Sequence, residues 1–452
     1  METQDLYYAV IAYAAASNNL CLFTGAGFSK AITDNNALSW EDLLKKVCDN
    51  SELLAIKDAL FSSEKAKPDL EIAAHIINIE LNQHKKDIYS EIASIINDIN
   101  LSSHFEEENN AIHNFLKKIE KLKVITTNYD MLFEKLATAA KESYVSIAEG
   151  QPIFGDSANI EVYHIHGHID WPQYMIVTVD DYFKFMSKES YFSRKLSTLL
   201  YESTVVFLGY SLEDHNLKRI INDYKISSQT DNVQSNLFFV SRYPIDQHIK
   251  AYYENSYGIQ VIDNTETENF FKKTNEHLKD TSEAVKHLGE IVKSYLDDGK
   301  NCPNEYLQYD NLSFINIINA FTLQRKSIKN EDVINLIKDI VSKKIDLAKN
   351  AEASQKQGQY ETLASWLIYL SRSFDIEKTE LKDTFLKVAY DSLSNPFAYN
   401  RWKNEFPTIK PSNREIIVNY INGQLEEKSK ENTNFSEQHV YFASNLKENF
   451  FP

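Results

Sequence analysis

The sequence of 452 residues is poor in cysteine and glycine, and it has no long apolar segment. Its three cysteines, Cys21, Cys48 and Cys302, form no CxxC pair, so the sequence predicts neither a zinc ribbon nor a disulfide framework. The N-terminus lacks the basic start of a signal peptide, and the absence of an apolar run of about 18 residues argues against a transmembrane helix. We therefore expect a cytoplasmic protein.

Basic residues are also scarce relative to acidic ones. The 48 lysines and arginines are outnumbered by 65 aspartates and glutamates, which gives a formal net charge of −17 at pH 7. Proteins that bind nucleic acid need clustered lysine and arginine, so we expect no direct nucleic-acid binding. The composition, 43% hydrophobic and 25% charged, is typical of a globular chain, and its length favours two or three domains of roughly 150 residues.

Seven short apolar segments, rich in β-branched and aromatic residues, predict buried strands. They are residues 20–24, 123–126, 162–165, 175–178, 204–208, 236–240 and 259–262. Helical patterns, such as that of residues 212–224, lie between them. This alternation predicts an α/β fold with a Rossmann-like, doubly wound parallel sheet.

Two regions depart from the alternation. Residues 38–120 predict a helical insertion, with amphipathic helices at 40–48, 69–83 and 87–99. After Asp263 the pattern is mostly helical. Helical periodicity covers residues 270–296, 314–328, 333–348, 361–374 and 381–393, and a linker is expected at 299–305. We expect a sheet domain at 1–265 and a helical region for assembly or regulation at 266–452.

The helical region carries many large aromatic side chains, and these favour two interpretations. They are Trp366, Tyr369, Phe397, Tyr399 and Trp402. In the first interpretation they remain exposed and join copies of the chain into a homo-oligomer. In the second they form the core of the region itself.

Four of the 11 glycines directly follow predicted strands, namely Gly25, Gly27, Gly167 and Gly209. In an open α/β sheet the ligand crevice lies at these carboxyl ends of the strands, so the four together favour a ligand site. For any single glycine an ordinary tight turn is the alternative. The first turn, GAGFS at 25–29, offers N–H groups and a helix N-terminus to a pyrophosphate. It lacks the GK[ST] ending of a triphosphate loop, which disfavours ATP hydrolysis.

Polar side chains follow the same strand ends. Asn128 and Asp130, in the segment TTNYD, suit ribose hydroxyls, a carboxamide or a water molecule. Ser211, two residues after Gly209, suits a ribose or a phosphate. Each of these three residues also fits the N-cap of a following helix, which is the alternative at each position.

Three histidines alternate along the segment HIHGH, which would place His164, His166 and His168 on one face of a strand. Such pairs bind zinc in several hydrolases, but the pattern HxHxDH fails here, because His168 and Ile169 stand where aspartate and histidine are required. We expect no bound metal. His166 precedes Gly167 at a strand end and suits a general base.

The four turns, in this order, resemble the motifs of the sirtuin superfamily. The family pattern GAGxS, T-x-N-x-D, His-Gly and GxS corresponds to GAGFS, TTNYD, HIHG and GYSLEDHN, and the resemblance covers residues 18–263. It implies that residues 1–265 are an NAD+-binding catalytic domain, with His166, Asn128 and Asp130 as catalytic residues. The NAD+ contacts that it implies are Gly25, Ala26, Gly27, Phe28, Ser29, Thr127, Gly209 and Ser211.

Two departures separate the chain from the protein deacylases of this family. The two CxxC pairs of their zinc module are missing, and AITDNNALSW stands where they carry G-x-P-D-F-R. The sequence looks more like the zinc-free, sirtuin-like effectors of bacterial anti-phage defence. This implies an NAD+ glycohydrolase that releases nicotinamide and ADP-ribose and depletes NAD+ in abortive infection.

Members of that group pair with a HerA-type ATPase, pair with short Argonautes or carry a sensor domain. The helical region after residue 265 is more similar to the HerA-associated or self-assembling types, which implies a homo-oligomer and a HerA-like partner. A protein deacylase or ADP-ribosyltransferase is the alternative enzyme. A scaffold that senses NAD or ADP-ribose without turnover is the alternative outside enzymes.

Overall fold

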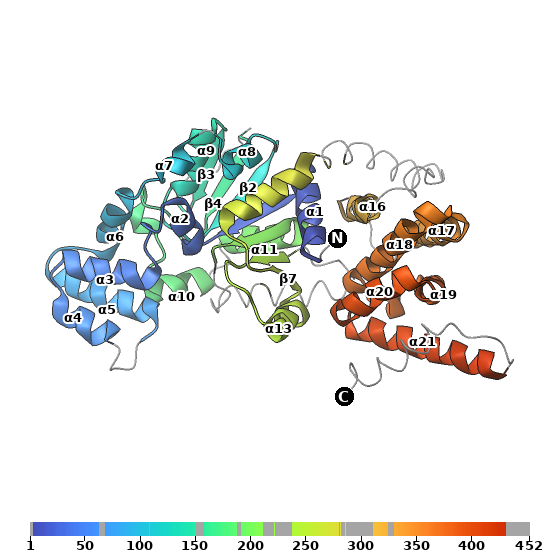
Figure 1. The fold of residues 1–452 in the computed structure, drawn as a ribbon. Helices are drawn as coiled ribbons and strands as arrows, with labels where there is room; N and C mark the ends of the chain where they lie inside the picture. Colours follow the sequence, from blue (N-terminus) through green and yellow to red (C-terminus); the bar gives the residue numbers. More distant parts are fainter. Residues whose placement is uncertain are drawn as a thin grey trace. The chain divides into compact units, whose positions relative to one another are not determined.

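The computed structural model describes residues 3–62, 68–107, 109–150, 158–187, 191–210, 237–279, 311–323 and 330–430, together with Ile221, Thr281 and Val285. These residues fall into two compact units (Figure 1). The first holds the sheet and extends to about residue 282, and the second holds the C-terminal helices. Every helix in the described ranges is too short or too polar to cross a membrane.

The described part of the first unit contains a seven-stranded sheet in which every strand pairs parallel to its neighbours. The order is β3-β4-β2-β1-β5-β6-β7, which confirms the Rossmann-like, doubly wound sheet. The strands are β1 (Leu20–Thr24), β2 (Leu122–Thr126), β3 (Tyr144–Ala148), β4 (Ile160–His164), β5 (Thr204–Leu208), β6 (Leu237–Val240) and β7 (Ile259–Ile262). The strand order reverses at β1, which lies between β2 and β5, and ligands bind at such switch points.

One predicted strand is wrong and one strand was missed. Residues 175–178 form no strand; they follow a short 3-10 helix (Pro172–Tyr174), and Met175 and Val177 are buried in the core of the helical insertion instead. These residues are apolar because they are buried, although they pair with no strand. The missed strand is β3 at the sheet edge, where Tyr144 is exposed and the apolar run is broken by Ser146.

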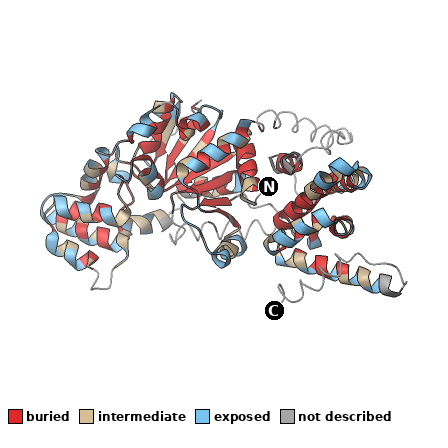
Figure 2. Cartoon of the chain, in the orientation of Figure 1, coloured by how far each residue is buried: buried red, intermediate tan, exposed pale blue. Residues whose placement is uncertain are grey.

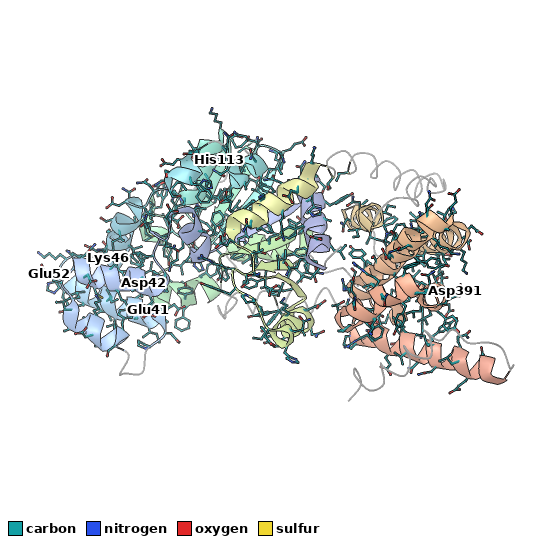
Figure 3. The ribbon with its side chains drawn as sticks, viewed as in Figure 1. Glu41, Asp42, Lys46, Glu52, His113 and Asp391 are labelled. Carbon is teal, nitrogen blue, oxygen red and sulfur yellow. The ribbon has the colours of Figure 1, made fainter. Side chains whose placement is uncertain are left out.

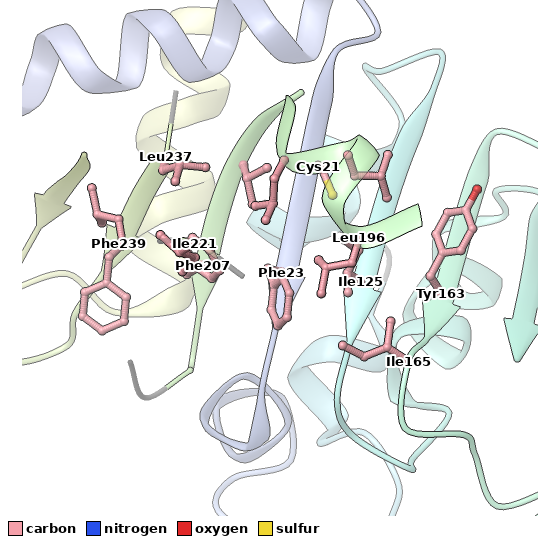
Figure 4. Close-up of a cluster of buried hydrophobic side chains, with 14 of the residues drawn as sticks. Cys21, Phe23, Ile125, Tyr163, Ile165, Leu196, Phe207, Ile221, Leu237 and Phe239 are labelled. Carbon is pink, nitrogen blue, oxygen red and sulfur yellow. The ribbon is translucent and has the colours of Figure 1, made fainter. Parts of the chain in front are cut away.

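One face of the sheet packs on α11 (Tyr191–Glu202). Figure 4 shows the buried cluster there, in which Phe23 of β1 and Phe207 of β5 meet Leu196 of the helix. The alternate strand residues are buried as well, since helices also contact the strands from α1 (Thr3–Ala16) and α9 (Leu132–Ala140). Burial on both faces explains why the strands are nearly continuous apolar runs.

A helical insertion follows α2 (Ala26–Ile32) and precedes β2. It comprises α3 (Trp40–Asn50), α4 (Leu54–Phe61), α5 (Leu70–Gln83), α6 (Ile88–Asn97), α7 (Ser103–Glu106) and α8 (Ala111–Leu116). Ser39 and Asp87 cap α3 and α6 by accepting hydrogen bonds from backbone N–H groups in their first turns. The core of the insertion also includes Tyr129, which follows β2. The insertion therefore packs directly on the segment TTNYD.

The first unit continues beyond the sheet. After α13 (Gln247–Tyr257) and β7, residues 267–279 are helical, and Phe270 and Phe271 are fully buried. The ring of Phe271 lies 5.1 Å from that of Phe115 on α8, and Asn275 donates a hydrogen bond to the carbonyl of Ala111. This helix therefore belongs to the sheet unit. The predicted helix at 212–224 and the linker at 299–305 lie almost wholly outside the described residues.

The second unit is helical. Its described elements are α16 (Asn311–Leu323), α17 (Glu331–Asn350), α18 (Ala353–Ser373), α19 (Lys382–Leu393), α20 (Pro396–Glu405) and α21 (Pro411–Lys430). Asp391 of α19, labelled in Figure 3, accepts a hydrogen bond of 2.7 Å from Lys349 of α17. Ring stacking joins Trp366 of α18 to Phe314 of α16.

The aromatic residues of this region mostly form its own core. Trp366, Tyr369 and Trp402 are 1%, 5% and 0% exposed, and the buried faces of the helices are visible in Figure 2. The interpretation that these three side chains remain exposed for assembly is therefore wrong. Phe397, by contrast, is 41% exposed.

Candidate functional site

The carboxyl ends of β1 and β5 are joined through glycines. The Gly25 amide donates to the carbonyl of Leu208 at 3.1 Å, and the Gly27 amide donates to the carbonyl of Gly209 at 2.7 Å. Gly209 has φ +61°, and a Cβ there would lie 1.9 Å from the backbone nitrogen of Phe28. The glycines thus permit two chain segments to touch, and the amides of Gly25 and Gly27 are engaged within the protein.

Ser29 connects this turn to the end of β2. Its hydroxyl donates to Oδ2 of Asp130 at 2.8 Å and accepts from the side-chain amide of Asn128, also at 2.8 Å. The side chain of Asn128 therefore faces the first motif and does not cap a helix. Three of the residues that the sequence places in the site meet here, and two of them are partly open to solvent, while Ser29 is buried.

Asp130 has a dual role. Its Oδ1 accepts from the backbone N–H of Leu132 at the start of α9, so the capping interpretation is partly right for this residue. Although Asp130 is partly open to solvent, the removal of water from its carboxylate raises its pKa, and the hydrogen bonds from Ser29 and Leu132 offset this only in part. Thr127, the neighbouring predicted contact, is partly buried.

His166 follows β4 and packs against α10 (Val179–Ser187). The side chain is 7% exposed, and its ring lies 5.4 Å from that of Tyr182 and 5.9 Å from that of Phe185, both edge-to-face. Its carbonyl accepts from the amide of Ile176. Neither Tyr182 nor Phe185 could be predicted from the sequence, because they belong to α10 and do not follow a strand.

His164 is fully inside the protein. Its Nε2 lies 2.7 Å from Oε1 of Glu134 on α9, and its Nδ1 lies 3.3 Å from the carbonyl oxygen of Asn128. Burial by itself would lower the pKa of His164, but the charge of Glu134 and the two hydrogen bonds raise it above its usual value. The same pairing lowers the pKa of Glu134 despite its burial.

The three histidines do not share one strand face, so that expectation is wrong. β4 ends at His164, and Gly167 has φ +78°, which turns the chain. His168 accepts a hydrogen bond at Nδ1 from the amide of Asp170, and burial together with the nearby His164 lowers its pKa. Across the described residues, no group of three or more His, Cys, Asp or Glu side chains could hold a metal ion.

A pocket of about 490 Å³ lies beside Asp130 and Glu134, whereas Ser29, Asn128 and His166 do not line it. Asp130 and Glu134 line it together with the end of α6, a turn of α7, and Ile169 and Asp170 after β4. In the segment GYSLEDHN, Gly209 accepts the hydrogen bond from Gly27 described above. Ser211 lies outside the described residues.

Comparison with known proteins matches part of the chain to a named domain type. Residues 122–262, which include the second, third and fourth motifs, match the model of the SIR2-like domain. The sirtuin-like character of this part of the chain, inferred from its motifs, is therefore confirmed.

The curated relatives are bacterial. The chain is 27% identical over 228 residues to a protein named NAD(+) hydrolase ThsA from Cytobacillus dafuensis, covering 50% of this chain and 42% of the relative. The ThsA of Enterococcus faecium is 30% identical over 221 residues, covering 47% and 41%. Defense-associated sirtuin 2 of Bacillus subtilis is 25% identical over 162 residues, covering 35% and 16%. The chain spans less than half the length of these relatives.

Proposed function

We propose that the chain is an NAD+ glycohydrolase that cleaves NAD+ to nicotinamide and ADP-ribose and acts in anti-phage defence by depleting NAD+. The observation that carries the proposal is the cluster at the ends of β1, β2 and β4. There Ser29 bridges Asn128 and Asp130, and His166 follows β4 in an aromatic enclosure. In support, residues 122–262, which include Asn128, Asp130 and His166, match the SIR2-like domain, and two relatives of the chain are named NAD(+) hydrolases.

The proposed reaction is a hydrolysis at C1′ of the nicotinamide ribose. The bond from C1′ to the pyridinium nitrogen breaks, and its electron pair stays on nicotinamide. The oxygen of water bonds to C1′, and His166 accepts the proton that this water loses. Asn128 orients the ribose or the water, held by its hydrogen bond to Ser29. The rings of Tyr182 and Phe185 exclude bulk water from His166.

A nicotinamide-release assay on the purified chain tests this function. We expect nicotinamide and ADP-ribose from NAD+ and water alone. A protein deacylase would release nicotinamide only with an acylated peptide, and an ADP-ribosyltransferase would leave ADP-ribose on an acceptor. Tight NAD+ binding with no product under any of these conditions would favour a sensing scaffold over an enzyme.

Regulation is assigned in this proposal to the helical region, because the residues proposed for catalysis and NAD+ contact all lie before residue 212. Free NAD+ hydrolysis would exhaust the cell, so the resting enzyme needs restraint. From resemblance, the candidate partner is a HerA-like ATPase. The test is deletion of residues 300–452 followed by NAD+ binding and cleavage with and without that ATPase. A truncated protein that still responds fully to the partner would contradict a regulatory role for this region.

Self-association is proposed through α5 of the insertion. One stripe of this helix consists of aliphatic side chains that are 41%, 38% and 53% exposed, namely Ile72, Ile76 and Ile79. Their spacing aligns them on one face, opposite the face that α5 buries. Residues 69–71 at one end include two carboxylates, and residues 84–86 at the other end are basic. In an antiparallel pair of copies, each acidic end meets a basic end.

Light scattering tests this assembly. We expect the wild-type chain to scatter as an oligomer and Ile76→Glu to shift it toward the monomer. Leu54→Glu is the matched control, because Leu54 is 60% exposed on the same insertion but lies on α4. A wild-type monomer at micromolar concentration, or equal effects of the two variants, would contradict the α5 interface.

A further inference from the structure

We infer that His164 is a positioning residue for the proposed NAD+ cleavage: as an imidazolium paired with Glu134, it fixes the backbone of Asn128 at the end of β2. The inference rests on the proposed function, since it concerns the residue that orients the ribose or the water. It assigns a task to two side chains that the proposed reaction itself does not use.

The protonation of His164 follows from the two atoms that its ring nitrogens face. Nε2 lies 2.7 Å from a carboxylate oxygen of Glu134, and Nδ1 lies 3.3 Å from the carbonyl oxygen of Asn128. Both atoms are acceptors, and a neutral imidazole has only one N–H to donate. The imidazole of His164 and the carboxylate of Glu134 are buried, since the two residues are 1% and 2% exposed. Bulk solvent therefore does not replace either hydrogen bond of His164. The pKa of Glu134 is lowered, so its carboxylate is ionised and accepts, and with an ionised Glu134 only the doubly protonated ring donates to both atoms.

The pair is anchored from three elements of the fold. Glu134 is on α9 and His164 ends β4, while Ser146 of β3 donates a hydrogen bond of 2.6 Å to the same Oε1 of Glu134. Asn128 is consequently held at two points. His164 binds its carbonyl, and Ser29 accepts from its side-chain amide. A residue fixed at both backbone and side chain has little freedom to leave a productive orientation.

The surrounding charges agree with a protonated His164. Glu134 and Asp130 face it from α9 and from the turn before that helix, and both raise its pKa. His168, whose ring lies 5.0 Å away, has a pKa lowered by burial and by the charge of His164, while the exposed Asp170 acts in the opposite direction on His168. One charged and one neutral histidine therefore stand side by side.

Three variants test the inference: His164→Leu, Glu134→Leu and the double variant. Each single variant leaves one charge buried alone, so we expect a large loss of thermal stability. The double variant removes both charges, and we expect its melting temperature to return toward wild type. We expect its kcat to remain about 100-fold low with KM changed little, because Asn128 is no longer fixed. Full recovery of kcat in the double variant would make the pair merely structural and overturn the inference.

The matched control is the pair His104 and Glu268 in the same unit. Its His–Glu distance is 2.9 Å, but the two side chains are 53% and 41% exposed. His104→Leu with Glu268→Leu should leave kcat and its pH dependence unchanged. Should the double variant of the buried pair fail to fold, Glu134→Gln keeps the shape and removes the charge. We expect it to lose activity at a lower pH than wild type, and an unchanged basic limb would overturn the inference.

A measurement without turnover separates this inference from the proposed function. We expect amide hydrogen exchange of residues 126–131 to accelerate in Glu134→Gln or the double variant, while exchange in β1 and β5 stays as in wild type. A wild-type chain that cleaves no NAD+ would contradict the proposed function. The exchange result would still show whether His164 and Glu134 fix the backbone of Asn128. Unchanged exchange at 126–131 would overturn the positioning even in a fully active enzyme.

Discussion

The amide of Gly27 donates a 2.7 Å hydrogen bond to the carbonyl of Gly209, a residue about 180 positions further along the chain. This contact closes the carboxyl ends of β1 and β5 against each other, and both residues tolerate no Cβ there. At the carboxyl edge of the sheet, the backbones after β1 and β5 are therefore in direct contact.

Gly209→Ala should break this junction. Its φ of +61° and the 1.9 Å approach to the Phe28 nitrogen together predict a loss of about 3 kcal/mol in the free energy of unfolding of the sheet unit. Gly358→Ala is the control, because a Cβ on that residue of α18 meets nothing within 4 Å. There we expect a gain of about 1 kcal/mol. Urea denaturation measures both, and equal stability of the two variants would contradict the prediction.

Ser29→Ala should uncouple Asn128 from Asp130. The hydroxyl bonds to both side chains, so its loss should cost about 1–2 kcal/mol of stability and lower kcat about 10- to 100-fold. The hydrogen bond from Ser29 lowers the pKa of Asp130, so that pKa should rise further in the variant. The acid limb of the pH–rate profile should move to higher pH. Unchanged rates between about pH 5 and 8 would show that the hydrogen bonds of Ser29 to Asn128 and Asp130 are dispensable.

His166→Ala and Asn128→Ala should each abolish NAD+ cleavage while the fold and NAD+ binding remain. Loss of a general base or of the residue that orients the reacting groups costs about 100-fold or more. His248→Ala on α13 and Asn82→Ala on α5, both exposed, are the matched controls. Nicotinamide release and equilibrium binding measure the two properties. A folded variant with wild-type turnover removes its residue from the catalytic assignment.

The buried pair of His164 and Glu134 predicts a stability maximum. The pKa of His164 is raised from its ordinary 6.5, so its contribution is full below pH 6.5 and is lost as pH rises through the folded-state pKa. The pKa of Glu134 is lowered from 4.5, so its contribution is present above pH 4.5 and is lost as pH falls through its folded-state pKa. For wild type, the denaturant concentration at the unfolding midpoint should decrease both above the folded-state pKa of His164 and below that of Glu134. The double leucine variant should lack this component.

Chelation should leave the proposed NAD+ cleavage unaffected. The described residues offer no cluster of metal-ligating side chains, and the three cysteines are scattered. We expect no loss of NAD+ cleavage after dialysis against EDTA and no stoichiometric zinc by elemental analysis. About one metal per chain, absent from His168→Ala, would contradict this and favour a metallohydrolase.

The sheet was predictable because six of its strands are buried on both faces and therefore appear as apolar runs. The same logic failed at residues 175–178, whose apolar side chains pack into the insertion, and at β3, whose exposed Tyr144 breaks the run. Burial can be recognised from apolar residues in the local sequence. Strand pairing depends on neighbouring strands that the local sequence does not specify.

The site was predictable only where its residues follow strands. Asn128, Asp130 and Ser29 belong to turns that parallel strands bring to one edge, so their meeting follows from the fold. Glu134 gave no such signal, because a glutamate in a helix is usually a surface charge. Its burial depends on His164, which another strand supplies.

The pairing of β1 with β5 has a consequence for how the protein is made. β1 leaves the ribosome well before β5, so this pairing is complete only when Leu208 has been synthesised. Contacts so distant in sequence form slowly, because a long loop must close first. A nascent or truncated chain that ends before Gly209 has no glycine junction, and we expect such fragments to be harmless to the cell that makes them.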